Sequence, residues 1–153
     1  GQSVAVTSLQ LANIFGFITS GKSHTPHLIN SIYTEDRNLY NYVSTAKTTT
    51  LNPETVKIVN NMLFNNINTD NKFTFIAGYD VGGKTGTAQK VGPNGQYMQG
   101  NYILSFLGAA PMNDPKAVVY LAIDNPKNTI QYGGVVAAPM VGDIFEQILL
   151  LHM

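Results

Sequence analysis

The sequence has 153 residues, of which 44% are apolar and 12% are charged, which is typical of a folded globular domain and not of a disordered chain. Nine basic residues balance nine acidic ones without a basic run, which argues against a nucleic-acid-binding surface. No stretch approaches the roughly 18 to 20 consecutive apolar residues of a membrane span, and the absence of cysteine excludes disulfide bonds and thiolate zinc sites.

The first predicted element is a helix within residues 6–22 (VTSLQLANIFGFITSGK). Thr7 and Gln10 have the spacing of a capping box, and Gly21 is a plausible C-terminal stop. The apolar side chains expected to form one inward stripe are Leu11, Ile14, Phe15 and Ile18.

The next predicted elements are a short strand and a second helix. Residues 26–33 (PHLINSIY) predict the strand, and residues 34–51 predict a polar connection rich in Thr and Asn. The second helix is expected to begin at Asn52, with Pro53 in its first turn, and to fade within residues 65–72. The residues expected to face inward are Val56, Val59 and Leu63.

Three strands are predicted in quick succession, at residues 81–91, 101–109 and 117–124. The connectors GPNG (92–95) and PMNDP (111–115) are short, and Asn-Gly is a strong hairpin signal. Short connectors force neighbouring strands to pair antiparallel. An antiparallel meander is therefore expected.

The last predicted element is a closing helix at residues 137–151, with Pro139 in its first turn. Tyr132, Gly133 and Gly134 are expected to shape the turn into this helix. Together the elements predict the α+β class, with an antiparallel sheet flanked by helices. No internal repeat or linker marks a second domain.

The stretch AGYDVGGKTGTAQK (77–90) contains two overlapping motifs. From Gly78 it matches G-x-x-x-x-G-K-T, the phosphate-binding loop of nucleotide hydrolases, and from Lys84 it matches K-T-G-T, a signature of serine acyl-transferases that recognise β-lactams. The nucleotide interpretation has some support. FTFIA (73–77) could be the strand before the loop, and VVYLAID (118–124) imitates the strand that ends in a Mg²⁺-binding Asp.

The residues after Lys84 favour the strand interpretation. A phosphate loop opens a helix whose N-terminus meets the anion, whereas here two threonines and a glycine follow, and a Gly-Pro pair closes the segment seven residues past Thr85. On a strand, Lys84 would place a positive charge in a cleft, Gly86 would permit close approach of a substrate backbone, and Thr87 would add a hydroxyl. A bare K-T-G triplet would more often be an ordinary edge strand with a solvated lysine.

Four blocks of the sequence resemble class B penicillin-binding proteins in order and spacing. They are GQSVAVTSLQLANIF, GYDVGGKTGTAQKVGPNGQY, ILSFLGAAP and VVYLAIDNP…QYGGVVAAP. The resemblance covers the chain from Gly1 to Met153, as the C-terminal part of one transpeptidase domain of the β-lactamase/transpeptidase-like fold. KVGPNGQY and DNP…YGGVVAAP are most similar to the division and sporulation branches.

The resemblance implies a serine D-alanyl-D-alanine transpeptidase that cross-links peptidoglycan stem peptides and is acylated by β-lactams. It implies that Lys84 organises the charge and proton network of the cleft. It implies that Thr85, Gly86 and Thr87 line the substrate site, with the Thr87 hydroxyl near the substrate carboxylate. The backbone N–H of Thr87 would be one of two oxyanion-hole donors.

Two family signatures that should precede Lys84 are not where the family has them. No Ser-x-Asn occurs, and the single Ser-x-x-Lys, STAK at 44–47, follows the block that comes after both signatures in the family. Ser44 is therefore expected in a solvent-exposed turn. The nucleophile is expected upstream of Gly1, so the chain alone is expected to be inactive. A non-catalytic β-lactam- or peptidoglycan-binding or sensor module of the same fold stays open as an alternative, with a nucleotide hydrolase as a remote one.

The resemblance also implies partners and a location. The partners are stem peptides ending in D-Ala-D-Ala, β-lactam antibiotics, the N-terminal part of the same domain, and cell-division or sporulation proteins. The location is the extracytoplasmic face of the bacterial plasma membrane, with the anchor outside this sequence. No cofactor or metal is expected, since His24, His27 and His152 lack metal-ligand spacing and Asp124 is better explained as the polar end of a strand.

Overall fold

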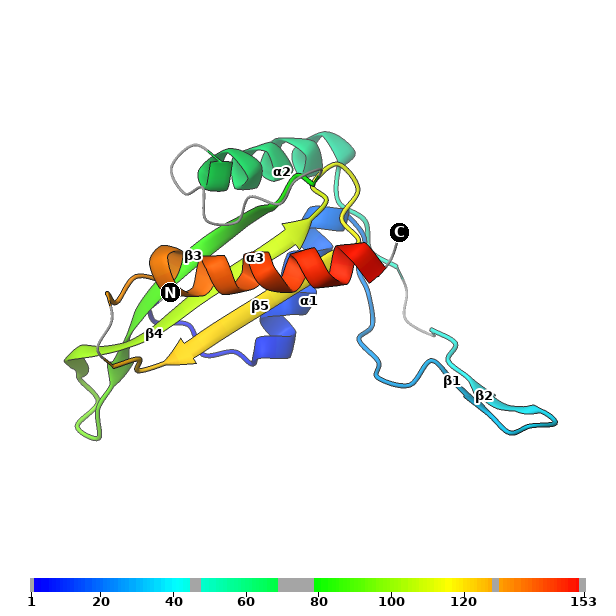
Figure 1. Cartoon of the computed structure of the whole chain (residues 1–153), viewed down its shortest axis with the longest axis horizontal. Coiled ribbons are helices and arrows are strands. Elements are labelled where there is room, and N and C mark those ends of the chain that lie inside the picture. Colours follow the sequence, from blue (N-terminus) through cyan, green and yellow to red (C-terminus); the bar gives the residue numbers. More distant parts are fainter. Residues whose placement is uncertain (1, 45–47, 69–78, 128–129, 152–153) are drawn as a thin grey trace.

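The central element of the fold is an antiparallel sheet with the strand order β3-β4-β5 (Figure 1). The computed structural model describes residues 2–44, 48–68, 79–127 and 130–151. The strands are β3 Gly82–Val91, β4 Tyr97–Ala110 and β5 Ala117–Asp124, and each pairs antiparallel with the next. The predicted meander and the predicted α+β class are therefore confirmed.

Helix α1, Ser8–Ser20, begins and ends as the sequence predicts. The Thr7 side chain accepts from the Gln10 N–H, and the Gln10 side chain accepts from the Thr7 N–H, which completes the capping box. Gly21 ends the helix in the left-handed conformation with φ of 74°. The predicted stripe is partly wrong, because Phe15 is buried but Ile14 is 51% exposed.

Helix α2, Pro53–Asn68, also begins where it was predicted. Asn52 precedes it, and its side-chain Oδ1 accepts from the Glu54 N–H at 2.8 Å, a side-chain cap of the helix start. Asn60 and Ile67 are its buried residues, whereas the predicted inward residues are only half-buried. They are Val56, Val59 and Leu63.

A two-stranded hairpin lies apart from the main sheet (Figure 1). Its strands are β1 Ser31–Tyr33 and β2 Asn38–Asn41. The prediction placed a longer strand at 26–33 and missed β2, which lies in the predicted polar connection. Nearly every hairpin residue is exposed, so the burial pattern that normally marks a strand is absent there.

Helix α3, Gly133–Leu151, starts earlier than predicted, and Pro139 lies inside it and not in its first turn. The carbonyl of Tyr132 accepts from the N–H groups of Val135 and Val136, which establishes the first turn. A proline inside a helix removes one hydrogen bond and costs about 3 kcal/mol. Tight packing of the surrounding residues on the sheet offsets this cost, since Ala137, Ala138, Val141 and Phe145 are all fully buried.

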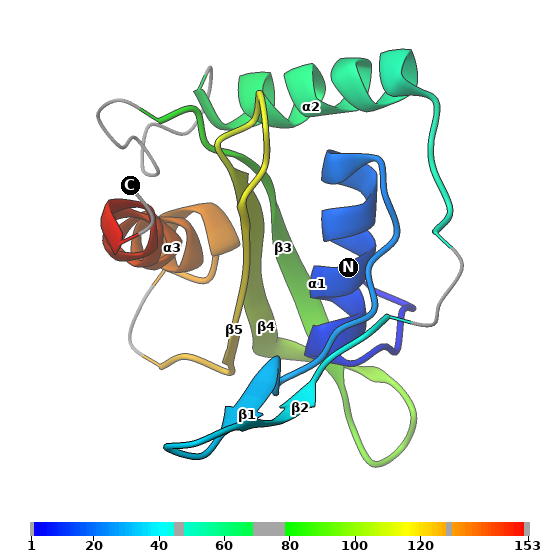
Figure 2. The same ribbon diagram turned by 90° about the vertical axis from the view of Figure 1, so that its right-hand side faces the viewer.

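The helices cover both faces of the sheet (Figure 2). On one face, α3 packs with Phe106, Ala110 and Val81 around Phe145. On the other face, α1 contributes Phe15 to a smaller cluster with Ala109 and Met112, while α2 crosses the end of the sheet. Within the described residues, α3 is the one helix long and apolar enough to cross a membrane, and its packing on the sheet explains that apolar character.

Candidate functional site

The Lys84–Thr87 run lies in the middle of β3, in extended conformation, and no helix starts at Lys84. Lys84 is paired with Leu107 and Gly86 with Ser105 on the neighbouring strand. The phosphate-loop interpretation is therefore wrong, because its anion site requires a helix that opens at the lysine. Its proposed preceding strand, 73–77, lies outside the described residues.

The free edge of β3 can be identified from hydrogen bonds along the sheet. The carbonyls of Tyr102 and Ala110 accept bonds from the β5 side, so the odd-numbered residues of β4 between them direct their backbone groups toward β3. Their partners on β3 are the even-numbered residues, including Lys84 and Gly86. The backbone N–H and C=O of Thr85 and Thr87 consequently point away from the sheet, toward the free edge.

Three hydrogen bonds at that edge agree with this assignment. The outward carbonyl of Gly83 accepts from the Asn66 side chain at 3.1 Å, and the outward carbonyl of Val81 accepts from Asn68 at 3.2 Å. The Thr85 carbonyl accepts from the Lys84 ammonium at 3.2 Å. A donor placed outside β3 reaches each of these oxygens, so the Thr87 N–H is aimed at the same space.

Lys84 has an exposed side chain that carries an uncompensated charge within the described part of the chain. The salt bridges there join Lys90 to Asp124 and Lys116 to Asp114, and Lys84 takes part in neither. Its ammonium donates a hydrogen bond to a neutral backbone carbonyl, that of Thr85. Lys84 therefore places a positive charge at the free edge of the sheet, beside the outward N–H of Thr85 and Thr87.

The start of α3 contacts β3 from the face of the sheet that α3 covers. The Gly133 N–H donates to the Thr87 hydroxyl oxygen at 3.3 Å. A Cβ at Gly133 would lie 2.5 Å from the carbonyl oxygens of Gly86 and Ser105, so only glycine lets the helix approach this closely. A Cβ at Gly86 would meet the Ser105 hydroxyl, so packing within the chain also favours glycine at position 86.

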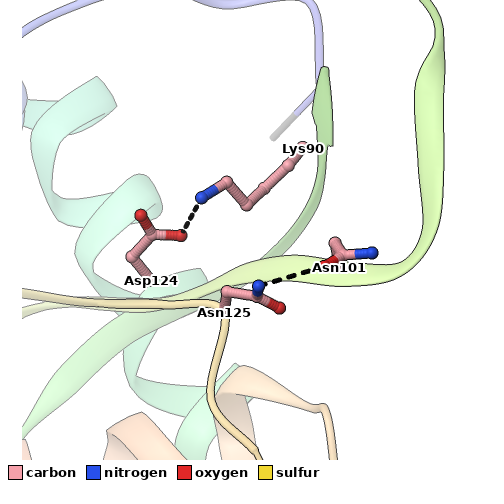
Figure 3. A network of polar contacts seen from close by, with 4 residues as sticks. All are labelled: Lys90, Asn101, Asp124 and Asn125. Carbon is pink, nitrogen blue, oxygen red and sulfur yellow. Dashed lines mark hydrogen bonds and ion pairs between the residues drawn. The ribbon is translucent and has the colours of Figure 1, made fainter. Parts of the chain in front are cut away.

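The far end of the sheet carries a separate polar network (Figure 3). The Lys90 ammonium lies 2.6 Å from an Asp124 carboxylate oxygen, and the Asn125 side chain donates to Asn101 at 3.0 Å. Asp124 therefore ends its strand as an ion-pair partner. Among the described residues, no group of three His, Cys, Asp or Glu side chains is placed to hold a metal.

The remaining candidate residues are Ser44 and the three histidines, which lie outside the Lys84–Thr87 strand. Ser44 is exposed in an irregular segment, as expected, and the rest of STAK lies outside the described residues. His24 contacts the Ser20 hydroxyl, and the His27 ring stacks on Tyr42 with centroids 3.7 Å apart. His152 lies outside the described residues.

Sequence reasoning missed two contributors to the edge, Asn66 and Asn68 of α2. Asparagine at the end of a helix carries no signal of a bond to a distant strand, because the contact spans 13 to 17 residues of sequence and arises only in the fold. Gly133 was expected to shape a turn. Its contact with Thr87 also arises from tertiary packing.

A helix-flanked antiparallel sheet with Lys-Thr-Gly-Thr on its open edge is the arrangement that the penicillin-recognising class would require. The family model described as the penicillin binding protein transpeptidase domain matches residues 1–148. The chain therefore belongs to the family of penicillin-binding protein transpeptidase domains.

Individual relatives agree with this assignment. The chain is 40% identical to Stage V sporulation protein D of Bacillus subtilis, over 97% of this chain and 24% of that protein. It is 29% identical to a peptidoglycan D,D-transpeptidase FtsI homolog of Mesostigma viride, over 97% of this chain and 27% of that protein. The chain thus spans about a quarter of the length of these curated relatives.

Solved structures support the fold in the same way. Penicillin-binding protein 3 of Mycobacterium tuberculosis in its apo form matches with a TM-score of 0.85 and 25% identity, over 99% of this chain and 36% of that one. A peptidoglycan synthetase from Bifidobacterium adolescentis matches with a TM-score of 0.83 and 24% identity, over 99% of this chain and 28% of that one.

Proposed function

We propose that this chain supplies the Lys-Thr-Gly-Thr wall of the active cleft in a serine D-alanyl-D-alanine transpeptidase. The observation that carries the proposal is the free edge of β3, where the backbone N–H of Thr87 points outward next to the charge of Lys84. Relatives named as peptidoglycan D,D-transpeptidases support the reaction type. The substrates are peptidoglycan stem peptides that end in D-Ala-D-Ala, and β-lactams acylate the same serine.

The proposed reaction is acyl transfer through a covalent intermediate. A serine oxygen attacks the carbonyl carbon of the penultimate D-Ala, the C–N bond to the terminal D-Ala breaks, and that residue leaves with a proton on its amine. An amine of a neighbouring stem peptide then attacks the acyl-enzyme and regenerates the serine hydroxyl. The Thr87 N–H donates to the oxyanion that forms in each step, a contact whose loss typically costs about 3–4 kcal/mol.

The side chains of the motif recognise charge. Lys84 attracts the substrate carboxylate and takes part in the proton network of the cleft. Thr85 and Thr87 line the cleft with hydroxyl groups. Gly86, which lies between them and has no side chain, lets the substrate backbone approach the strand closely. Because the Gly133 N–H donates to the Thr87 oxygen, the hydroxyl hydrogen of Thr87 stays free to donate to the carboxylate.

The serine is proposed to come from residues outside this sequence, in the N-terminal part of the same domain, with the Ser-x-x-Lys and Ser-x-Asn signatures. The substrate places the reaction at the extracytoplasmic face of the bacterial plasma membrane, with the anchor in a segment outside this sequence. A role in cell division or sporulation, with partners from those processes, is proposed from the similarity to Stage V sporulation protein D.

The test uses a fluorescent penicillin with the 153-residue chain and with the complete domain. The chain alone is expected to remain unlabelled, whereas the complete domain is expected to be labelled covalently. Labelling of the chain that disappears in Ser44→Ala would overturn the proposal that the nucleophile lies elsewhere. Lack of labelling of the complete domain would overturn the proposed activity.

Lys84→Ala in the complete domain tests the motif itself. The acylation rate constant is expected to fall by about 100-fold or more, because the proton network and the carboxylate site lose their charge. Lys90→Ala is a matched control on the same strand, since its ammonium is engaged with Asp124, and it is expected to change the rate less than about twofold. Equal effects of the two substitutions would contradict the role of Lys84. Penicillin labelling without release of D-Ala would instead favour the non-catalytic binding module.

A further inference from the structure

The upstream half of the β3 edge is closed by side-chain amides. Asn66 and Asn68, in the last turn of α2, donate to the carbonyls of Gly83 and Val81. Outward carbonyls recur at every second residue of a strand, so these two amides occupy two successive positions of the edge. We call Asn66 and Asn68 together the amide clamp.

The downstream half of the same edge is open in the described part of the chain. The Thr85 carbonyl contacts only the exposed Lys84 ammonium, a long side chain that can move away. No described residue donates to the backbone carbonyl of Thr87 or accepts from its N–H on that side, and β3 pairs only with β4. An extended ligand can therefore pair with the edge from Thr85 onward but not before Lys84.

This division has a consequence for substrate length, which rests on the proposed function. If the reacting carbonyl accepts from the Thr87 N–H while the carboxylate lies toward Lys84, the peptide runs antiparallel to β3. The leaving residue then lies opposite Gly86, and further residues would lie opposite Thr85, Lys84 and Gly83 in turn. The third added residue would meet the carbonyl that Asn66 already occupies.

We infer that the amide clamp is a specificity determinant that limits how far an acyl donor can extend beyond its reacting carbonyl. The substrate class is an extended acyl-D-alanyl donor whose leaving group ends in a carboxylate before Gly83. Asn66 acts directly at the Gly83 position, and Asn68 closes the next position at Val81. The clamp thus favours cleavage at the end of a peptide over cleavage within one.

The experiment uses acyl-D-alanyl thioesters of thioglycolate with the complete domain. The thioglycolate leaving group is extended by one glycine, which would end opposite Thr85, or by five glycines, which would end opposite Val81. Acylation joins the serine oxygen to the carbonyl carbon, breaks the C–S bond and releases a thiol, which a thiol reagent measures. The readout is the ratio of kcat/KM for the one-glycine thioester to that for the five-glycine thioester.

In the double variant Asn66→Ala, Asn68→Ala this ratio is expected to fall about tenfold, because the longer donor gains pairing positions at Gly83 and Val81. The single variant Asn66→Ala is expected to lower it about threefold, and it keeps the test available if the double variant does not fold. Asn65→Ala is the matched control on the same turn, because Asn65 is exposed and none of its side-chain atoms bonds β3, and the ratio is expected to stay the same.

The outcomes distinguish a role of the amide clamp in donor specificity from a role that only supports the fold. A structural role would lower both rate constants by the same factor, so an unchanged ratio in the folded Asn66→Ala variant would overturn the inference. An increased ratio would overturn it as well. If the unsubstituted domain released no thiol from any thioester and formed no penicillin adduct, the proposed function would fall first, and the inference with it.

Discussion

The two faces of the β3-β4-β5 sheet are held to their helices in different ways. On the α3 face, Phe106 and Phe145 are fully buried, and Gly133 lets the helix start directly above the strand backbone. On the α1 face, Phe15 is the one residue of α1 in the buried apolar cluster, and Ile14 remains 51% exposed.

Polar contacts replace close packing on the α1 face. The Asn60 side chain of α2 donates to the Thr19 carbonyl of α1 at 2.9 Å and to the Met112 carbonyl after β4 at 3.3 Å. The comparison indicates that shape holds α3 in place, whereas directed hydrogen bonds hold α1 and α2. The strand β3, which carries Lys84 on its free edge, contacts helices on both faces of the sheet. The position of this edge therefore depends both on the packing of α3 and on the hydrogen bonds that hold α1 and α2.

The largest expected effect is the loss of packing at the centre of the α3 face. Phe145→Ala removes a fully buried ring and is expected to lower the free energy of unfolding by about 4 kcal/mol. Phe15→Ala makes the same change in the smaller cluster and is expected to cost about 2 to 3 kcal/mol, since fewer neighbours surround the ring. Urea unfolding of the chain, followed by circular dichroism, measures both values. Equal losses at the two positions would show that the faces do not differ in packing.

A matched pair of glycine substitutions tests how closely α3 and α1 pack on the two faces of the sheet. Gly133→Ala is expected to lower the free energy of unfolding by about 3 kcal/mol, because the new methyl group would meet two backbone oxygens that cannot move independently of the sheet. Gly16→Ala, inside α1, is expected to raise it by about 0.5 to 1 kcal/mol, since its Cβ would lie at an ordinary 3.8 Å from Val118. The same denaturation experiment applies, and a stabilising Gly133→Ala would show that α3 can dock without the glycine.

Local patterns in the sequence were sufficient for much of this fold. The capping box at Thr7 and the stop at Gly21 involve residues only a few positions apart, so the sequence displays them completely. The GPNG connector likewise predicted a turn, and Gly95 adopts a positive φ of 77° there. The ends of α1 and the end of β3 were predicted correctly, whereas β4 begins at Tyr97, four residues before the predicted strand at 101–109.

Features that depend on tertiary packing were not predictable in this way. The early start of α3 requires Gly133 to fit above Gly86 and Ser105, which are 47 and 28 positions away in the chain. The β2 strand was missed because it has no buried face. Residue types on a short exposed hairpin carry little information about pairing.

The candidate site likewise contains residues that a local sequence motif identifies and residues that only the tertiary structure identifies. Lys84 to Thr87 could be singled out because the motif is contiguous and a strand fits its composition. Asn66 and Asn68 could not, because an amide that bonds a strand edge has no characteristic sequence spacing. The direction of the Thr87 N–H also needed the register with β4, which a sequence does not contain.

The smallest expected loss of stability concerns the polar contacts on the α1 face. Asn60→Ala removes both amide bonds and leaves the carbonyls of Thr19 and Met112 without this donor, so the free energy of unfolding is expected to fall by about 2 kcal/mol. Asn61→Ala is the control on the same helix, because Asn61 is exposed, and a change below about 0.5 kcal/mol is expected. Hydrogen exchange of the α1 amides distinguishes the mechanisms. If polar contacts hold α1, Asn60→Ala speeds exchange in α1 but not in α3, and faster exchange in both helices would indicate one cooperative core without the division between faces.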